Sequence, residues 1–310
     1  MRIAVLIPCH NESATVGKVV ADFRAALPHA DIWVFDNASS DDTAQHAAAA
    51  GAHVRRVNAR GKGHVVRAMF RDVQADAYLM VDGDDTYPAA EAPRLLAPVL
   101  AGEADMVVGT RLQTHAAGAF RRFHGFGNRL VCWTLARLFG HQVGDALSGY
   151  RAFWRRFVKS MPVLSRGFEI ETEMMVFALS GDYAVAEHAV AYGARPPGSH
   201  SKLRTFSDGA RVLRTVAFLY KDLRPLLCFG TIALACVLAG LGCGLFVIHE
   251  FQQTGLVLHP STAVLAVAFI LTGLIALATG LVLDTVNRRS EEIQRLLTDQ
   301  VLAQDPNTDR

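Results

Sequence analysis

Two aspartates one residue apart are the residues of this chain best suited to hold a divalent cation. Asp82 and Asp84 flank Gly83, directly after the apolar run Tyr78–Val81. Carboxylate oxygens are the ligands that hard divalent cations prefer, and a glycine lets the backbone approach a ligand closely. Such an ion can stabilise the charge that develops on a departing phosphate. Short acidic clusters also occur in ordinary turns, so this motif depends on its context.

The context is an alternation of strand and helix signals over the first 110 residues. The pattern predicts a mostly parallel, Rossmann-like sheet with crossover helices, that is, an α/β domain. The expected strands are Ile3–Ile7, Ile32–Phe35, His53–Val57, Tyr78–Val81 and Met106–Val108. The expected helices lie near Ala14–Leu27, Thr43–Ala50, Gly63–Val73 and Ala89–Leu100.

Polar residues follow these strands, at the edge where α/β sheets place their chemistry. Pro8, His10 and Glu12 follow the first strand, Asp36 ends the second, and Lys62 follows the third. This shared position favours a binding site over an ordinary turn for the acidic pair after the fourth strand.

Two uncharged apolar runs occur late in the chain, Leu226–Ile248 and Ala263–Leu283. At about 1.5 Å per residue, each is long enough for a bilayer core of about 30 Å. The alternative is a pair of buried helices in a soluble core, but runs of this length without charge are typical of membrane spans. We therefore expect a two-helix transmembrane hairpin.

The charges around the runs predict the orientation of the hairpin. Lys221 and Arg224 precede the first run, Arg288 and Arg289 follow the second, and the connector His249–Pro260 has no Lys or Arg. Because cytosolic flanks are enriched in Lys and Arg, we expect a multi-pass protein of the cytoplasmic (inner) membrane, with the catalytic domain and both termini cytosolic.

Composition excludes other classes. The formal net charge of +2 argues against a nucleic-acid binder. No pair of the five cysteines has metal-ligand spacing, so we interpret them as reduced thiols. They are Cys9, Cys132, Cys228, Cys236 and Cys243.

Together the motifs resemble the GT-A glycosyltransferases of family 2, and within it the polyprenyl-phosphate glycosyltransferases related to dolichol-phosphate mannose synthase. The resemblance covers roughly residues 1–224. The matching segments are residues 7–12, 36–41, 61–63, 82–84, 108–111, 145–153, 167–173 and 198–202.

The resemblance implies a role for each donor-side residue. Pro8, His10 and Glu12 would line the base and ribose pocket, with Asp36 on the base. Lys62 would lie near the nucleotide, and Asp82-Gly83-Asp84 would place Mg²⁺ or Mn²⁺ on the diphosphate.

Three positions depart from the family pattern. His10 stands where Tyr is common, and Asn37 stands where a second Asp is common. Both bear on whether UDP or GDP is bound. Thr86 replaces a Gln that is often a metal partner in the mannose synthases.

The acceptor side can be argued from charge. A lipid monophosphate carries about −1.5 to −2, so it needs cations to hold it rather than a strong base. Arg111 matches the acceptor-side arginine of the family, and Arg129 belongs to a later arginine cluster. Arg195, Ser201 and Lys202 match the loop that closes over the diphosphate and acceptor. Each arginine and the loop also have a plainer interpretation, as a solvated basic surface.

Asp145 precedes the turn Ser148-Gly149-Tyr150, where related sugar-to-hydroxyl transferases keep a catalytic base. With a phosphate acceptor we assign it to site orientation. Asp84, Arg111 and Asp145 form the predicted catalytic set. In the family, the segment that carries Glu169, Glu171 and Glu173 begins a helix beside the site. The plainer role for one or two of them is to cap that helix, since acidic residues stabilise a first turn.

Two further stretches, Phe120–Phe139 and Leu203–Leu223, interleave arginines with apolar residues. Basic amphipathic helices can lie in the headgroup region. The alternative is a pair of ordinary helices that face a protein core.

The sequence therefore predicts a GT-A domain at 1–202, a juxtamembrane helix at 203–224, two spans within 225–284 and a cytosolic tail at 285–310. The predicted reaction transfers a hexose from UDP or GDP to polyprenyl (undecaprenyl) phosphate with inversion, for envelope glycans. The predicted partners are the nucleotide sugar, polyprenyl phosphate, the lipid bilayer and, through packing at Gly240, Gly242 and Gly244, a second copy of the chain, with no nucleic acid. A processive polysaccharide synthase is disfavoured, because no Gln-x-x-Arg-Trp pattern occurs. A non-catalytic membrane adaptor remains the alternative of a different class.

Overall fold

The structure is a computed structural model that describes residues 1–111, 119–167, 169–181, 183–193, 218, 221–222 and 224–303. Within these ranges the side chains of 119–126, 291, 294, 295 and 297–303 are not described. The chain divides into two compact units. The first is Met1–Val212 with Thr298–Arg310, and the second is Leu213–Leu297.

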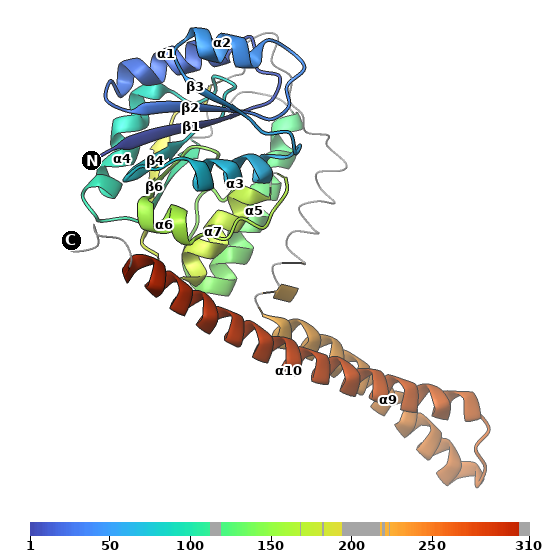
Figure 1. Cartoon of the computed structure of the whole chain (residues 1–310). Coiled ribbons are helices and arrows are strands. Elements are labelled where there is room, and N and C mark those ends of the chain that lie inside the picture. The colour runs from blue at the N-terminus through green and yellow to red at the C-terminus, as the bar shows by residue number, and fades with distance from the viewer. Residues whose placement is uncertain are drawn as a thin grey trace. The chain divides into compact units, whose positions relative to one another are not determined.

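The first unit is built on a seven-stranded sheet in the order β3-β2-β1-β4-β6-β5-β7 (Figure 1). The strand β6 is antiparallel to its neighbours β4 and β5, and every other pair is parallel. The predicted mostly parallel sheet is confirmed. The strands are β1 Ile3–Cys9, β2 Asp31–Asp36, β3 His53–Arg56, β4 Ala77–Met80, β5 Met106–Arg111, β6 Arg151–Trp154 and β7 Val185–Val190.

Helices cover both faces of this sheet (Figure 1). The helices α1, α2 and α4 pack together on one face, and α3, α6 and α7 on the other. Because both faces are covered, the central strand β4 is buried along its whole length. The helices are α1 Val16–Ala26, α2 Thr43–Ala49, α3 Lys62–Asp72, η1 Ala89–Glu91, α4 Ala92–Leu100, α5 Ala119–Phe139, α6 Arg155–Ser160 and α7 Ile170–Ser180.

Each face has its own apolar layer. On the first face, apolar residues at helical spacing in α1, such as Val16, Val20 and Phe23, join the core cluster of the sheet. On the second face, Phe153 of β6 stacks on Phe157 of α6, with ring centroids 5.3 Å apart.

Polar contacts fix the strands that the sequence did not predict. Asp105 accepts hydrogen bonds from Arg156 Nη2 (2.8 Å) and from the backbone N of Ala184 (3.0 Å), which ties β6 and β7 to β5.

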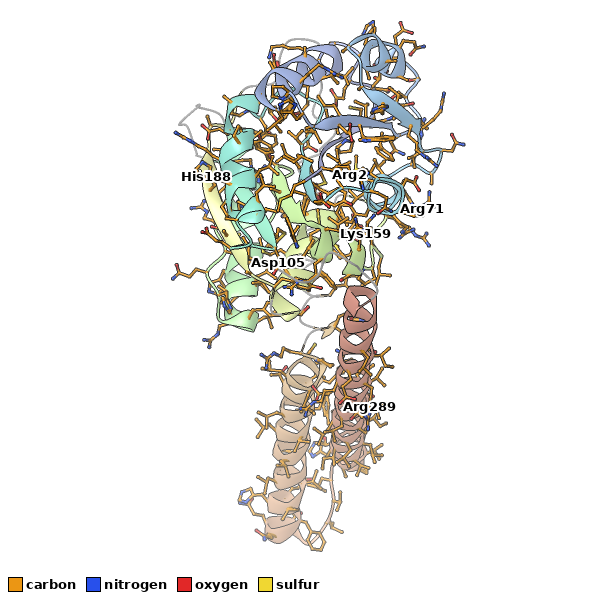
Figure 2. The ribbon with its side chains drawn as sticks, turned by 60° about the vertical axis from the view of Figure 1, so that its left-hand side comes forward. Arg2, Arg71, Asp105, Lys159, His188 and Arg289 are labelled. Atoms are coloured by element: carbon orange, nitrogen blue, oxygen red, sulfur yellow. The ribbon has the colours of Figure 1, made fainter. Side chains whose placement is uncertain are left out.

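A polar contact also joins α6 to α3. Lys159 Nζ donates to the carbonyl oxygens of Phe70 (2.6 Å) and Val73 (2.9 Å) at the C-terminus of α3. Asp105 and Lys159 are labelled in Figure 2.

The second unit contains the two apolar helices, α9 Pro225–Thr254 and α10 Pro260–Ala303. By length and composition, Pro225–Thr254 and Pro260–Ser290 can each cross a membrane, with mean hydropathies of 2.4 and 2.5. Both predicted apolar runs lie inside these helices. The charged segment after Arg289 continues α10 as helix.

Small residues let α9 and α10 pack closely as a hairpin. A Cβ atom added at Gly240 would lie 2.9 Å from the Ala266 carbonyl oxygen, and one added at Gly273 would lie 3.0 Å from the Ala233 carbonyl oxygen. The buried positions recur every seven residues, the spacing of a left-handed pair of helices. Apart from Pro225 at the start of α9, they are Ala233, Gly240 and Val247 on α9 and Ala266, Gly273 and Gly280 on α10.

The sequence named Gly240, Gly242 and Gly244 as residues for packing a second copy. In the structure Gly240 contacts α10 of its own chain, whereas a Cβ atom at Gly242 or Gly244 would meet nothing within 4 Å. The predicted homo-oligomer stays a prediction.

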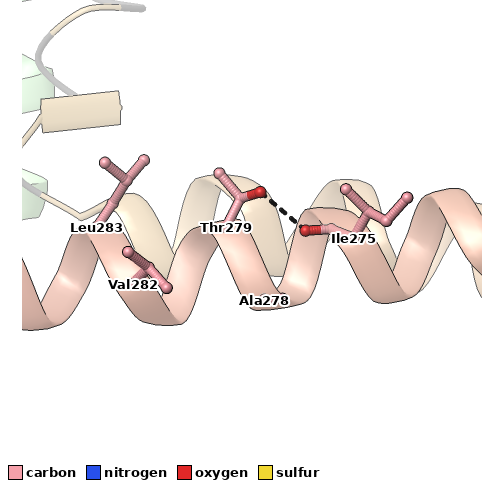
Figure 3. Close-up of a pocket in the computed structure, with 5 residues that line it drawn as sticks. All are labelled: Ile275, Ala278, Thr279, Val282 and Leu283. Atoms are coloured by element: carbon pink, nitrogen blue, oxygen red, sulfur yellow. Dashed lines mark hydrogen bonds between the residues drawn. The ribbon is translucent and has the colours of Figure 1, made fainter.

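A shallow hollow lies on the surface of α10 (Figure 3). Its one polar side chain, Thr279, donates its hydroxyl to the Ile275 carbonyl oxygen at 2.8 Å. The hollow is therefore an apolar helix surface, and we assign it no chemistry. Its lining residues are Ile275, Ala278, Thr279, Val282 and Leu283.

Candidate active site

The acidic pair lies at the carboxyl end of β4, beside β1. The chain order along the sheet reverses between these two strands, which is where open α/β sheets bind ligands. The Thr15 hydroxyl donates to the Gly83 carbonyl oxygen at 2.7 Å. A Cβ atom at Gly83 would clash with the Cys9 sulfur, so the turn that carries Asp82 and Asp84 packs directly on β1 and requires glycine.

Asp84 is buried and oriented by Thr86. Its Oδ1 accepts hydrogen bonds from Thr86 Oγ1 (2.6 Å) and Thr86 N (3.3 Å). Thr86, which stands where the family often has Gln, therefore orients the side chain of Asp84. The next acid, Asp85, pairs with the exposed Lys18 at 2.8 Å instead.

Lys62 joins the acidic pair to a second carboxylate. Its Nζ lies 2.5 Å from Asp82 Oδ1 and 2.5 Å from Glu171 Oε1. Burial lowers the pKa of Lys62, but the two carboxylates outweigh it, so the pKa is raised and the ammonium stays charged. Burial raises the pKa of Glu171, and Lys62 opposes that rise. With both carboxylates ionised, this Lys62 cluster of one cation and two anions has a net charge of −1.

The glycines beside Lys62 are required by close backbone packing. A Cβ atom at Gly61 would clash with the Arg166 carbonyl oxygen, and one at Gly63 with the Ser165 carbonyl oxygen. Glu173 holds that segment, since its carboxylate accepts hydrogen bonds from Ser165 N (2.9 Å) and from the preceding backbone N (2.7 Å). The start of α3 is thus clamped against the loop before α7.

Asn37 secures the loop that leads into Lys62. Its amide nitrogen donates to the carbonyl oxygens of Val57 (3.2 Å) and Ala59 (2.7 Å), and its Oδ1 accepts from Gly61 N (2.8 Å). An aspartate has no N–H to donate to those carbonyls. The departure from the family pattern at this position therefore has a structural reason.

The ends of β1 and β2 are tied to each other. Glu12 N donates to Thr43 Oγ1 at 2.8 Å, and Asn11 N donates to Ser39 Oγ at 2.9 Å. Asp36 is buried and accepts a hydrogen bond from Ser39 N at 3.1 Å. The predicted base-side residues therefore share one wall of the site, from the end of β1, with Pro8 and His10, to the end of β2.

Arg111 and Asp145 form a two-bond ion pair. Arg111 Nε lies 2.7 Å from Asp145 Oδ2, and Nη2 lies 2.9 Å from Oδ1. Backbone N–H groups of Arg111 (3.3 Å) and Leu147 (3.1 Å) also donate to the carboxylate. Burial lowers the pKa of Arg111, but the hydrogen bond to Asp145 and the attraction of Tyr87, Asp145 and Tyr192 together raise it above its usual value. The guanidinium packs over the Tyr192 ring at 5.5 Å.

Tyr87 and Arg151 both hold the turn that follows Asp145, a role that the sequence did not indicate for either residue. The buried Tyr87 hydroxyl lies 3.4 Å from Ser148 Oγ and accepts from Gly149 N at 3.3 Å. A Cβ atom at Gly149 would clash with the Asp82 carboxylate, so the turn after Asp145 touches the acidic pair.

Arg151 is fully buried behind that turn. It donates to the carbonyl oxygens of Ser148 (2.9 Å) and Ala146 (2.7 Å). Burial lowers its pKa, while nearby acids oppose that shift. A strand residue with a long cationic side chain gives no sequence signal for such a buried role.

The structure brings Lys62 together with Asp82, and Arg111 together with Asp145. Arg129 lies on the exposed side of α5. Arg195, Ser201 and Lys202 lie outside the described residues. From the sequence, Glu171 could be identified only as one of three glutamates at the start of a helix, and its contact with Lys62 could not be predicted.

A divalent cation fits the acidic pair by the chemistry of its donors. Asp82, whose side chain is 30% exposed, and Asp84 supply oxygen ligands at one strand end. Within the described part of the chain, no group of three or more His, Cys, Asp or Glu side chains surrounds a single metal position. These two carboxylates therefore leave further coordination to the diphosphate or to water, as is common for Mg²⁺.

A mixed sheet with an acidic pair after β4 and a buried lysine at α3 is an arrangement that fits a nucleotide-sugar transferase. The family model for glycosyl transferase family 2 matches residues 4–161, and the chain belongs to that family. It is a glycosyltransferase with a GT-A fold that uses a nucleotide sugar donor.

Named relatives agree with that class. The chain is 35% identical over 296 residues to glycosyltransferase AglJ of Haloferax volcanii, which covers 95% of this chain and 97% of that protein. It is 26% identical over 199 residues to undecaprenyl-phosphate mannosyltransferase of Micrococcus luteus, which covers 56% of this chain and 76% of that protein.

Among solved structures, the chain resembles glucosyl-3-phosphoglycerate synthase from Mycobacterium tuberculosis. The complex of that enzyme with phosphoglyceric acid superposes with a TM-score of 0.58 and 26% identity, over 72% of this chain and 80% of that one. Another structure of the enzyme contains Mn²⁺, UDP and glucosyl-3-phosphoglycerate, with a TM-score of 0.58 and 25% identity.

Proposed function

We propose that this protein transfers a hexose from UDP or GDP to the phosphate of a polyprenyl lipid, with inversion at C1. An acceptor phosphate oxygen forms the new bond to C1 as the bond from C1 to the diphosphate oxygen breaks, and the nucleoside diphosphate leaves. The product is a lipid-linked monosaccharide.

The observation that carries the proposal is the set of hydrogen bonds around the Asp145 carboxylate. Both of its oxygens accept hydrogen bonds from Arg111, and two backbone N–H groups add to them. The two oxygens of a carboxylate offer about four lone-pair positions, and these four hydrogen bonds occupy them, so Asp145 presents no free oxygen to an acceptor hydroxyl. An acceptor phosphate has no proton to lose at the attacking oxygen, so it suits a site without a free base.

The donor half would be organised around Lys62. Asp82 and Asp84 would hold Mg²⁺ or Mn²⁺, which neutralises charge on the leaving diphosphate. Lys62 keeps Asp82 in place, and Glu171 keeps Lys62 charged. The Mn²⁺–UDP complex of the structural relative supports this arrangement.

The apolar hairpin supports a lipid acceptor over a soluble one. The helices α9 and α10 are long and apolar enough to span a bilayer, and a polyprenyl chain is itself confined to the bilayer. We propose that the hairpin anchors the enzyme in the cytoplasmic membrane with its transferase domain cytosolic. The undecaprenyl-phosphate mannosyltransferase among the relatives is consistent with this acceptor.

A transfer assay tests the proposal. Purified full-length protein is incubated in detergent with Mn²⁺ or Mg²⁺ and a panel of UDP- and GDP-sugars. The acceptors are undecaprenyl phosphate, undecaprenol, which lacks the phosphate, and 3-phosphoglycerate. We expect one donor to give a lipid with one sugar on undecaprenyl phosphate alone.

The other outcomes separate the rivals. Transfer to undecaprenol would mean a hydroxyl acceptor, and transfer to 3-phosphoglycerate would mean a soluble one like that of the structural relative. Products with many sugars would indicate a polysaccharide synthase. Absence of nucleotide release with every acceptor would favour the adaptor.

A further inference from the structure

Tyr192 packs against the arginine of the Arg111–Asp145 pair. It lies just beyond β7, and because β5 and β7 run parallel with Arg111 opposite Val190, it reaches the same end of the sheet as the candidate site. The Arg111 guanidinium carbon lies over the tyrosine ring, 5.5 Å from its centroid. This distance is within the range of a cation–π contact. The two strand ends therefore place an aromatic face against the guanidinium.

Asp145 occupies only one edge of that guanidinium. It accepts hydrogen bonds from Nε at 2.7 Å and from Nη2 at 2.9 Å, whereas the group carries further N–H donors in the same rigid plane. Among the residues that the structure describes, Nη1 of Arg111 has no hydrogen-bond partner. A plane held at one edge can still tilt about that edge, and the Tyr192 face limits this tilt.

Tyr192 is itself fixed by the loop that follows the acidic pair. The backbone N of Gly193 donates to the Thr86 carbonyl oxygen at 2.9 Å. The Tyr192 ring meets the Tyr87 ring edge to face, with centroids 5.2 Å apart. Because Thr86 also orients Asp84, the aromatic support of the arginine and the predicted metal ligand share one loop.

A second arrangement of this kind lies at the opposite end of the same two strands. Arg156 donates to both oxygens of Asp105, at 3.2 and 2.8 Å, and its guanidinium carbon lies 5.3 Å from the centroid of the Tyr183 ring. Asp105, labelled in Figure 2, directly precedes β5, and Tyr183 lies just before β7. None of the predicted site residues lies at this end, so it offers an internal control.

We propose that Tyr192 is a positioning residue for the acceptor, whose ring holds the Arg111 guanidinium so that its Nη1 edge receives the acceptor phosphate. The inference rests on the function proposed above, because that phosphate is the anion that would meet Arg111. Arginine binds phosphate through two N–H groups of one plane, so the orientation of the plane decides how well the acceptor is held. Tyr192 acts through Arg111 and needs no contact of its own with the phosphate.

Steady-state kinetics of the full-length protein in detergent test the proposal. The mole fraction of undecaprenyl phosphate in the micelles is varied at saturating nucleotide sugar, and then the reverse. Tyr192→Leu should raise the KM for the acceptor about fivefold, the order of effect expected for a lost cation–π contact, and leave the KM for the donor unchanged. Tyr192→Phe keeps the ring face and should restore the acceptor KM. Tyr183→Leu, the matched control, should lower the Tm without changing the acceptor KM.

A graded change of the ring separates its electrostatic effect from packing, and it remains informative if Tyr192→Leu does not fold. Phenylalanine carrying one, two or three fluorine atoms on the ring is placed at position 192. Fluorine keeps the ring shape but weakens the negative charge of its face, which is the part that attracts a cation. The acceptor KM should therefore rise with each fluorine, while the Tm and the donor KM stay constant.

Other outcomes contradict the proposal. An acceptor KM that stays constant across the fluorinated series would mean that the ring only fills space. Equal changes in Tyr192→Leu and Tyr183→Leu would mean a general loss of stability, and a higher donor KM alone would place Tyr192 at the donor half. If the parent protein transfers sugar to no lipid phosphate, the proposed function fails and this inference fails with it. Transfer by the parent with an unchanged acceptor KM in the variants refutes this inference alone.

Discussion

The Lys62 cluster and the Arg111–Asp145 pair lie on either side of one site, but their charges are arranged in opposite ways. In the first, one cation is held between two carboxylates, Asp82 and Glu171, at 2.5 Å each. In the second, one carboxylate is enclosed by one guanidinium and two backbone N–H groups. The first has excess negative charge, and the second has none.

This difference indicates what each half can bind. An anionic diphosphate cannot approach excess carboxylate charge unless a cation lies between them. In the function proposed above, Mg²⁺ or Mn²⁺ would be that cation at the donor half. At the proposed acceptor half the carboxylate is already paired, and the side chain of Arg111 is 29% exposed. That half would therefore bind an anion without a metal.

The largest effect should come from the donor half. Asp84→Asn removes a charged metal ligand and should lower turnover roughly a hundredfold or more, the cost typical of losing a group that stabilises developing charge. Asp85→Asn is the matched control, since Asp85 pairs with Lys18 instead. The backbone at position 85 is left-handed (φ 57°), a conformation that asparagine adopts as readily as aspartate. Initial rates at saturating Mn²⁺ measure both. Equal rates in the two variants would refute the metal assignment.

At the acceptor half we expect a smaller loss. Asp145→Asn should lower turnover about tenfold, because it disturbs the position of Arg111, whereas loss of a general base costs about 10² to 10⁴. The pH dependence of kcat distinguishes the two roles, since only a base would remove an ionisation from the profile. A loss above a thousandfold with an altered profile would mean that Asp145 acts as a base on a hydroxyl acceptor.

The buried charges of the Lys62 cluster should contribute to the free energy of unfolding. Glu171→Gln keeps the shape but removes one of the two anions around Lys62, and should lower the free energy of unfolding by about 1–3 kcal/mol. Glu169→Gln is the control, because Glu169 is exposed at the start of the same helix. Urea unfolding of both variants, followed by nucleotide affinity, measures the difference. No change for Glu171→Gln would show that Asp82 alone holds the lysine.

The smallest effect concerns the thiol behind the acceptor half. Burial raises the pKa of Cys132 from 9.0 to about 11. Between these values the unfolded chain releases a proton that the native chain keeps, so the free energy of unfolding contributed by Cys132 falls as pH rises. At pH 8 only roughly one thiol in a thousand is ionised.

Peptide mapping after iodoacetamide treatment checks this. The alkylation of native Cys132 should be slow at pH 8 and rise about tenfold per pH unit up to pH 10. Cys132 in urea-unfolded protein is the reference. Rapid alkylation of the native protein at pH 8 would contradict the burial of Cys132 beside the turn after Asp145.

The sequence predicted the parallel part of the fold well, because β1, β2, β4 and β5 are largely apolar runs close to polar residues at their carboxyl ends. It did not predict β6 and β7. Strand β6 is four residues long and begins with Arg151, whose burial depends on carbonyl groups that only the folded turn provides. Strand β7 contains Glu187 and His188 and lies at the edge of the sheet.

The candidate site shows the same limit. Asp82, Asp84 and Lys62 could be predicted as site residues because each of them follows a predicted strand. The sequence could not distinguish the roles of the three glutamates near α7, because the direction in which each side chain points depends on where the helix begins. Glu171 faces Lys62, while Glu173 accepts backbone N–H groups of the preceding loop. Asn37 likewise has a role that depends on three backbone groups from a later loop.

The clamp between the glycines of α3 and the loop before α7 has a consequence for synthesis on the ribosome. Gly61 and Gly63 pack on Arg166 and Ser165, and Lys62 pairs with Glu171. These three later partners are translated after the first five strands. A nascent chain that ends at β5 therefore contains Asp82 and Asp84 but lacks the second partner of the lysine. We expect the Lys62 cluster to be completed only when α7 has been translated, shortly before the apolar helix α9 follows.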